Sequence, residues 1–241
     1  KEYRRQRQMC IRDRYSWIVG AFQLAYTIFQ PLCGWLIDVI GLKLGFMICA
    51  TLWAIACIAH AGAGSWLHLA ILRFFMGGAE AAATPANAKT LGEWFPKSER
   101  PIAAGWAGVG FSVGAMLAPP IIYFAHASFG WQGAFMFTGA LALLWVVLWW
   151  AFYHNPEKHP NLGKAELALI QQDNEAPPVK LPFFTALKTV SKNKRFYGIA
   201  IPAFMAEPAW AVLSFWVPLY LAKEHGMDCL LYTSPSPRDT R

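Results

Sequence analysis

The sequence predicts an all-α, polytopic membrane helical bundle, and three observations lead to this class. Of the 241 residues, 56% are hydrophobic and 15% are charged, whereas soluble domains carry about a quarter of charged residues. The apolar residues gather in stretches of roughly 20, the length at which a helix crosses a bilayer core about 30 Å thick. Lysine and arginine concentrate in alternate connections between these stretches, which a soluble helical bundle has no reason to do.

Both ends of the chain are expected to be non-native, adaptor-derived tails. Residues 9–13 (MCIRD) and 229–234 (CLLYTS) can be encoded by nucleotide strings of which the second contains the reverse complement of the first, as in a translated sequencing adaptor. We therefore set residues 1–14 and 229–241 aside from the fold. In residues 15–228, 13 Lys and Arg stand against 11 Asp and Glu, so the formal charge of +7 falls to +2 and nucleic acid is not an expected partner.

Six stretches are long and apolar enough to span a bilayer. They cover about residues 15–37, 44–63, 66–88, 102–126, 131–153 and 196–221. The polar, Pro-bearing residues 154–195 are predicted to link two bundles, with one amphipathic helix around 164–173. Residues 15–153 then form a first bundle, and residues 196–228 contribute one helix to a second.

The positive charges predict an orientation. Eleven of the 13 Lys and Arg residues within 15–228 follow the first, third and fifth stretches, and the connections after the second and fourth have none. Because basic connections stay on the cytoplasmic side, the first stretch is expected to run from outside to the cytoplasm. Residues 154–195 are then a cytoplasmic loop.

Three motifs resemble the major facilitator superfamily of transporters. GWLIDVIGLK at residues 34–43 resembles the loop after the second helix of that family, RFFMG at 73–77 its helix 4, and GFSVGAMLAPP at 110–120 its helix 5. The resemblance covers residues 15–228 and implies a partial major facilitator fold, helices 2 to 7 of twelve, with helix 1 missing. Leu44 departs from the pattern, because many members carry a second basic residue there.

Further strings resemble the anion:cation symporter branch of that family, which handles sugar acids and organic anions. EWFPKSER at residues 93–100 carries this resemblance, and GAEAA at 78–82, AMLAPP at 115–120 and AEPAW at 206–210 are most similar to bacterial hexuronate transporters. The resemblance implies a monomeric inner-membrane symporter that imports a sugar acid such as glucuronate or galacturonate with protons, by alternating access and without a cofactor.

Arg73 and Glu80 are ionisable residues inside the third stretch, where a charge must face a partner or a water-filled cavity. Seven residues make almost two helical turns, so both side chains point the same way, about 10 Å apart along the axis. Gly77 and Thr84 share this face and are expected to keep it open. The resemblance places this face in the substrate cavity, where Glu80 would carry the proton and Arg73 would attract the sugar-acid carboxylate. The alternative is a structural polar network that locks helices together.

Other polar residues within the stretches are candidate substrate contacts. Tyr26 and Gln30 lie one turn apart on the first stretch and could hydrogen-bond substrate hydroxyls, although Tyr is also a common interfacial anchor. Glu207 precedes Pro208, a helix breaker of the kind that lines transporter cavities. Trp210 could stack on a sugar ring, or pack against lipid or protein.

The loop motif supplies the expected gating contacts. Asp38 lies at a helix end, where a cytoplasmic contact could close or open the bundle, and Gly34, Gly41 and Lys43 complete the motif. Four glycines of the fourth stretch are expected to permit close helix approach: Gly105, Gly108, Gly110 and Gly114.

No pattern of catalysis or metal binding is found in the sequence, so the chain is not expected to be an enzyme. Cys33, Cys49 and Cys57 lack metal-ligand spacing and are expected to be inert. His154 and His159 flank a Pro-bearing loop without further ligands. Three other functions stay open: an aldonate or aldarate symporter, an organophosphate:phosphate exchanger that would present more than one Arg, and a non-transporting membrane sensor with little use for Glu80.

Overall fold

The computed structural model describes residues 2–173, 181–213, 217, 220 and 221, with residues 2–13, 210 and 211 described by their backbone alone. The chain divides into two units, residues 1–180 and 181–241, and the division falls within the connection expected between the two bundles. Within the described residues the chain forms helices and turns but no strand, as the sequence predicts.

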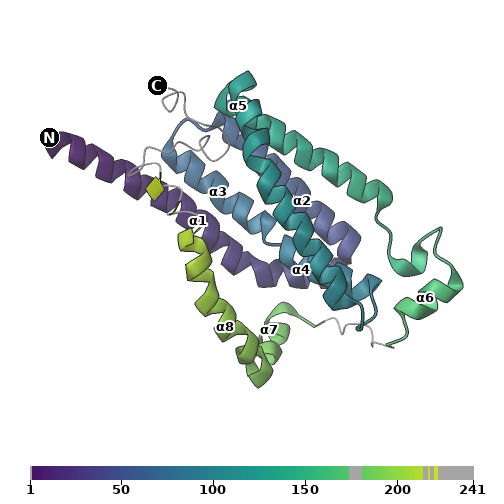
Figure 1. The fold of residues 1–241 in the computed structure, drawn as a ribbon. Coiled ribbons are helices and arrows are strands. Elements are labelled where there is room, and N and C mark those ends of the chain that lie inside the picture. The colour runs from purple at the N-terminus through teal and green to yellow at the C-terminus, as the bar shows by residue number, and fades with distance from the viewer. Residues whose placement is uncertain (1, 174–180, 214–216, 218–219, 222–241) are drawn as a thin grey trace, which may run out of the picture. The chain divides into compact units, whose positions relative to one another are not determined.

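The first unit is a helical bundle (Figure 1). Helix α1 packs chiefly against α3, and α2 packs against α3 and α5. The bounds of its helices are α1 Glu2–Ile40, α2 Leu42–Ala59, α3 Trp66–Glu80, α4 Ala83–Trp94, α5 Arg100–Phe152 and α6 Lys164–Ile170, with 3₁₀ turns at His60–Gly62 and Pro156–Lys158. The first predicted stretch lies in α1, the second in α2, the third in α3 and α4, and the fourth and fifth in α5.

A single glycine separates α1 from α2. The Gly41 amide donates to the carbonyl oxygen of Ile37 at 3.0 Å and so ends α1. Gly41 then takes a φ of 99°, a conformation open to glycine and strained for residues with a Cβ. The turn at the loop motif therefore depends on this glycine.

A tight turn at Ala81 and Ala82 separates α3 from α4. The Ala81 amide still bonds to the carbonyl of Gly77 at 3.0 Å, but the Ala82 amide bonds to Ala79, three residues back, at 3.4 Å. The third predicted stretch therefore consists of two consecutive helices with a 3₁₀-like turn between them. Glu80 is the last residue of α3 before this turn.

Helix α5 holds two predicted stretches that meet at Gly130. Its 53 residues would extend about 80 Å if straight, far more than a bilayer core. Gly130 breaks the helix with a φ of 72° and a ψ of −176°, within the predicted joint at 128–130. Two helices among the described residues are long and apolar enough to cross a membrane, Leu42–Gly62 and Arg100–Phe152.

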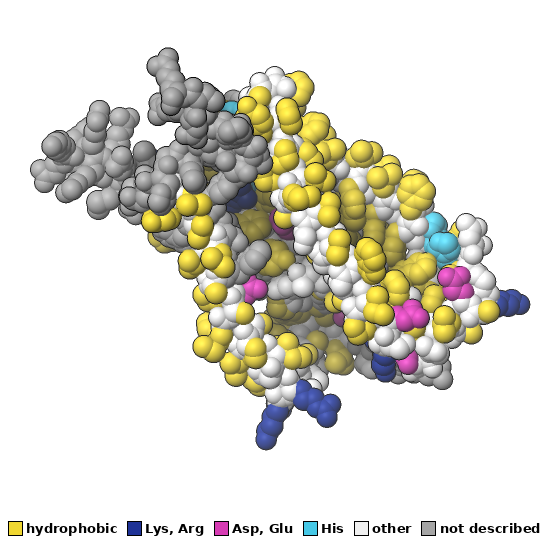
Figure 2. All heavy atoms as spheres, viewed as in Figure 1, with side chains coloured by type: hydrophobic (Ala, Val, Ile, Leu, Met, Phe, Trp, Pro, Cys, Tyr) yellow, Lys and Arg dark blue, Asp and Glu magenta, His cyan; other side chains and the backbone are white. Residues whose placement is uncertain are grey.

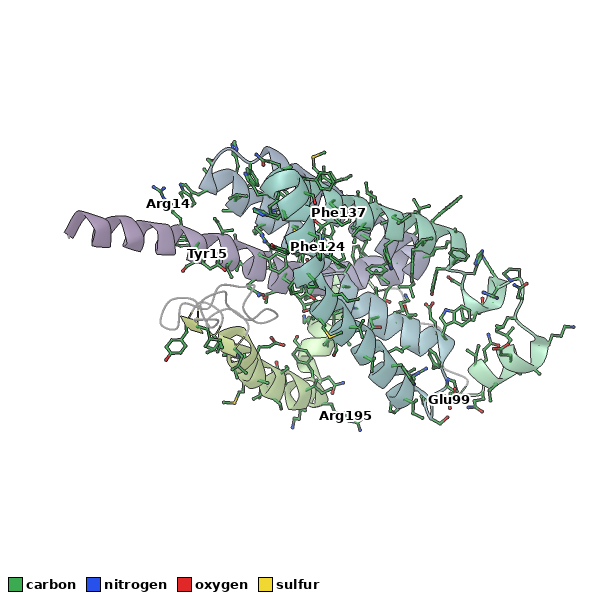
Figure 3. The ribbon with its side chains drawn as sticks, turned by 45° about the horizontal axis from the view of Figure 1, so that its top comes forward. Arg14, Tyr15, Glu99, Phe124, Phe137 and Arg195 are labelled. Atoms are coloured by element: carbon green, nitrogen blue, oxygen red, sulfur yellow. The ribbon has the colours of Figure 1, made fainter. Side chains whose placement is uncertain are left out.

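The two ends of the first bundle carry different residues. Figure 3 shows Arg14 and Tyr15 toward one end, and Glu99, before the start of α5, toward the other.

Figure 2 shows hydrophobic side chains over much of the described surface. Large side chains are strongly exposed on both limbs of α5, including Phe124 at 68% and Phe152 at 75%. A surface this apolar indicates burial in lipid or against further helices.

The buried core lies near the loop motif. Ile37 and Leu42, on either side of the Gly41 turn, are 1% exposed. Around them is one cluster, made of Cys33, Ile37, Leu42, Cys49, Ala81, Ala82, Ala86 and Tyr153. Cys33 and Cys49 in this cluster are buried free thiols, and so is Cys57 further along α2.

The glycines of α5 are not where helices approach most closely. A Cβ added at Gly105, Gly108, Gly110 or Gly114 would meet no atom within 4 Å. No described helix covers that face, so the expectation that these glycines permit close packing stays a prediction. Close approach occurs instead at Gly77 and Gly78 of α3, and at Gly139 in the second limb of α5.

The second unit contains α7, Phe183–Lys192, and α8, Lys194–Ala211. The Asn193 side chain caps α8 by accepting a hydrogen bond from the Arg195 amide at 3.0 Å. Helix α7 was not predicted, because its ten residues lie in a polar linker and are too few to give a membrane-span signal. The sixth predicted stretch begins in α8, and much of its end lies outside the described residues.

Candidate functional site

Arg73 and Glu80 are both half-buried on α3. The Arg73 guanidinium carbon lies 5.9 Å from the centroid of the Phe22 ring, a cation–π contact with α1. The positive charge of Arg73 acts on the Glu80 carboxyl group, yet among the described residues the one ion pair is elsewhere, between Lys89 and Asp38. The two groups are therefore electrostatically linked without a salt bridge between them.

The face between these two residues is covered by α1. A Cβ added at Gly77 would lie 2.5 Å from the Phe22 carbonyl oxygen, and one at Gly78 would lie 3.3 Å from the Phe29 ring. The Cys33 thiol donates to the carbonyl of Gly78 at 3.4 Å. The expectation that Gly77 keeps this face open is wrong, because the missing side chain lets the α1 backbone fill the space.

Tyr26 lies beside this site. Its hydroxyl is 3.0 Å from the Thr84 hydroxyl on α4, and its ring lies against Phe22 with centroids 6.0 Å apart. Thr84 follows Glu80 by four residues, across the step at Ala81 and Ala82. Gln30, one turn beyond Tyr26, is half-buried and makes no hydrogen bond to another described residue. The structure thus brings Arg73, Glu80 and Tyr26 to one region between α1 and α3.

Glu207 and Trp210 belong to α8 in the second unit. Glu207 is exposed and precedes Pro208, which lies inside the helix. The Trp210 side chain lies outside the described part of the structure. Both predicted substrate-contact residues therefore belong to one helix of the second unit, whereas Arg73, Glu80 and Tyr26 belong to the first unit.

Asp38 joins α1 to α4 at the loop-motif end of the first bundle. The Lys89 ammonium of α4 donates to Asp38 Oδ1 at 2.8 Å and to the carbonyl oxygen of Ile37 at 3.2 Å. In the sequence, Lys89 is only one of the basic residues that predict the orientation, and its ion pair with Asp38 was not predicted. The signal available was an acidic residue ending one stretch and a basic residue ending another.

The other loop-motif residues act through the backbone. A Cβ added at Gly34 would make ordinary van der Waals contact with the Pro85 ring at 3.4 Å, so α1 and α4 are close neighbours at this glycine. The Lys43 carbonyl oxygen accepts a hydrogen bond from the Trp149 indole at 3.2 Å. Together with the Gly41 turn, these contacts tie the motif to α4 and to the second limb of α5.

Glu93 and Tyr153 form a second polar contact at the same end. The Tyr153 hydroxyl donates to Glu93 Oε2 at 3.1 Å, and its ring stacks on Trp149 with centroids 4.0 Å apart. Burial raises the pKa of the Glu93 carboxyl group, while the Tyr153 hydrogen bond and the Lys89 charge oppose this shift. The sequence identified Glu93 only as the first residue of the EWFPKSER motif, and its contact with Tyr153 was not predicted.

Replacing Glu93 by Gln is expected to stabilise the protein at neutral pH. The fold raises the pKa of Glu93, so the protonated side chain contributes to the stability of the fold. This stabilisation is fully present below the ordinary carboxyl pKa of about 4.3 and is lost as the pH rises through the folded pKa. Gln stays neutral and still accepts from Tyr153. Thermal unfolding in detergent from about pH 4 to about pH 8 should give equal midpoints at low pH and a higher midpoint for the variant at high pH. A lower midpoint for Glu93→Gln at high pH would contradict this account.

The comparisons with known proteins agree on one family. The model of the Major Facilitator Superfamily matches residues 12–237. The chain is 42% identical to the hexuronate transporter of Escherichia coli (strain K12) over 217 residues, which cover 90% of this chain and 50% of that protein. It is also 42% identical to the galacturonate transporter of Dickeya chrysanthemi over 218 residues, 90% of this chain and 63% of that protein.

More distant relatives carry related names. The probable galactarate/D-glucarate transporter of Escherichia coli (strain K12) is 28% identical over 231 residues, which cover 89% of this chain and 51% of that protein. The chain therefore spans about half the length of several of the relatives that it matches.

Proposed function

Because this chain belongs to the Major Facilitator Superfamily and is a multi-pass membrane protein, we propose that it is part of a transporter that imports a hexuronate together with protons. The observation that carries the proposal is the pair on α3. Arg73 and Glu80 lie on one helical face, and the charge of Arg73 acts on Glu80 without an ion pair between them. The two relatives at 42% identity, named for hexuronate and galacturonate, support the substrate class.

The two side chains have complementary roles in this proposal. Arg73 presents a planar cation that a sugar-acid carboxylate can engage through two parallel hydrogen bonds. An ionised Glu80 attracts the same cation and so competes with the substrate. Protonation of Glu80 removes this competitor, which makes Arg73 available to the anion. Proton and substrate then load together, which is the requirement for symport.

The remaining predicted residues surround this step. Tyr26 and Gln30 contact substrate hydroxyls, and the Tyr26 hydroxyl exchanges its Thr84 partner for the sugar when it does so. Glu207 and Trp210 of the second unit are further proposed substrate contacts. Asp38, through its bond to Lys89, holds the loop-motif end closed in one state and releases it in the other.

The placement in the cell follows from the charges. The protein lies in the bacterial inner membrane with residues 154–195 in the cytoplasm, so α1 runs from outside to the cytoplasm. The transporter acts as a monomer.

Uptake into proteoliposomes tests the proposal directly. The complete transporter that contains this chain should accumulate radiolabelled glucuronate or galacturonate when the outside is acidic, and a protonophore should abolish the accumulation. Unlabelled hexuronates should compete better than galactarate, galactonate or a sugar phosphate. Accumulation that survives the protonophore would refute proton coupling, preferred uptake of an aldarate or aldonate would refute the substrate class, and binding without uptake would identify a sensor.

A further inference from the structure

The imidazole of His60 is completely buried at the end of α2, with 0% of its surface exposed. Its Nδ1 lies 2.7 Å from the carbonyl oxygen of Ala56, one turn earlier in the same helix. The ring also stacks on Phe135 of α5, with centroids 5.1 Å apart and an interplanar angle of 17°. Because a carbonyl only accepts hydrogen bonds, Nδ1 carries the hydrogen, and Nε2 of the neutral ring is an acceptor.

Nε2 has no hydrogen-bond partner within the described part of the chain. Leaving a buried acceptor without a donor costs free energy, and the bilayer offers no bulk water to supply one. The polar groups next along α2 and α5 have partners of their own. The Cys57 thiol lies 3.4 Å from the Thr138 hydroxyl, which in turn donates to the Ala134 carbonyl at 2.9 Å. Neither of these groups donates to His60, so we consider the neighbouring α3 as the source of a donor.

Arg73 on α3 is suited to be that donor. Helices α2 and α3 are antiparallel neighbours joined by a short turn. Side chains lean toward the N-terminus of their own helix, so Arg73 leans toward the turn and His60 leans back from it. The charge of Arg73 acts on His60 as well as on Glu80. Among the described residues the guanidinium has an aromatic contact but no hydrogen bond or ion pair.

We propose that Nε2 of His60 is an internal hydrogen-bond acceptor for the Arg73 guanidinium. Arg73 donates to it when Glu80 is protonated and no anion is bound. His60 is then a positioning residue that competes with the substrate carboxylate for Arg73. The inference rests on the proposed function, because it assigns a resting place to the cation that this function uses. His60 itself stays neutral throughout.

Few titratable groups surround this place in the described structure. Those on the neighbouring helices are Arg73, Glu80 and His68 on α3, Cys57 and His60 on α2, and Tyr26 and Arg14 on α1, where Arg14 lies over the Trp66 ring, while α5 contributes the uncharged Phe135 and Thr138. Glu80 is the group whose protonation removes a counter-charge from Arg73. Protonation of Glu80 should therefore move the guanidinium toward His60.

The position of Arg73 can be read from the nitrogen resonances of His60 without any transport. The complete transporter is labelled with ¹⁵N-histidine, and the His60 signals are identified as those lost in His60→Phe. Glu80→Gln, which is permanently neutral, should place Nε2 at the shift of a hydrogen-bonded acceptor. Adding Arg73→Met should return Nε2 to the shift of a free acceptor. An Nε2 shift that is the same in Glu80→Gln and in the double variant would overturn the proposal.

Substrate binding supplies the second readout. His60→Phe keeps a ring against Phe135 but removes the acceptor, so the apparent Kd for galacturonate should fall about tenfold, since a hydrogen bond to a charged group no longer competes. His60→Gln, whose amide oxygen can occupy the place of Nε2, should restore the original Kd. An unchanged or weaker affinity in His60→Phe would overturn the proposal. If no variant binds galacturonate but the Nε2 shifts behave as stated, the proposed substrate is wrong and the role of His60 stands.

Discussion

Replacing Glu80 by Gln is expected to abolish uphill uptake of the sugar acid while preserving exchange across the membrane. Gln resembles the protonated carboxyl group, so Arg73 stays available to the anion but no proton can be loaded or released. With an acidic exterior, accumulation in proteoliposomes should fall to about the level reached without a pH gradient. Exchange of external labelled substrate for internal unlabelled substrate should continue, because both directions use the neutral form.

The matched control for this experiment is Glu93→Gln. Glu93 is also a half-buried carboxyl group, but it lies at the loop-motif end and accepts a hydrogen bond from Tyr153. Proton-driven uptake should persist in this variant if coupling belongs to Glu80. Proton-coupled uptake retained in Glu80→Gln would exclude the carrier role. The pair with Arg73 would then be a structural polar network.

Replacing Gly77 by Ala is expected to destabilise the first bundle more than any other glycine-to-alanine change on α3 and α4. The new Cβ would lie 2.5 Å from the carbonyl oxygen of Phe22. This atom belongs to the α1 backbone, so it cannot move without shifting the helix. Forcing one methyl group into such a contact costs about 1–3 kcal/mol, and unfolding in mixed detergent micelles should report it.

Two other glycines serve as controls for this measurement. Gly78→Ala meets the Phe29 ring at 3.3 Å, and a side chain can shift, so the loss should be smaller. A Cβ added at Gly92, on α4, would meet no atom within 4 Å. Gly92→Ala should therefore stabilise the helix by up to about 1 kcal/mol. Equal stability of the Gly77 and Gly92 variants would show that α1 does not press on α3 at Gly77.

The fold was largely predictable from patterns within single stretches. The break at Gly130 and the turn at Gly41 both fall where apolar stretches were predicted to end, and both residues take positive φ values that glycine favours. Helix α7 was missed because a ten-residue amphipathic helix in a polar linker has no comparable signal. The step at Ala81 and Ala82 was missed because alanine suits either helical geometry.

The candidate site was predictable only in part. The charges of Arg73 and Glu80 are conspicuous inside an apolar stretch, since each requires compensation there. The contacts of Lys89 and Tyr153 are much less conspicuous, because their partners Asp38 and Glu93 lie 51 and 60 residues away in the chain. The burial of His60 likewise depends on Phe135 of a distant helix. Such pairs become visible only when the helices are placed together.

The sequence by itself therefore determined that the chain is a bundle of apolar helices and where most of these helices end. It could do so because an apolar environment requires each helix to satisfy its own backbone hydrogen bonds. The tertiary structure alone decided that α1 covers Gly77, that Lys89 meets Asp38 and that His60 is buried with an acceptor that no other described residue fills. These outcomes depend on which helical faces meet, and that depends on side-chain shape across helices distant in sequence.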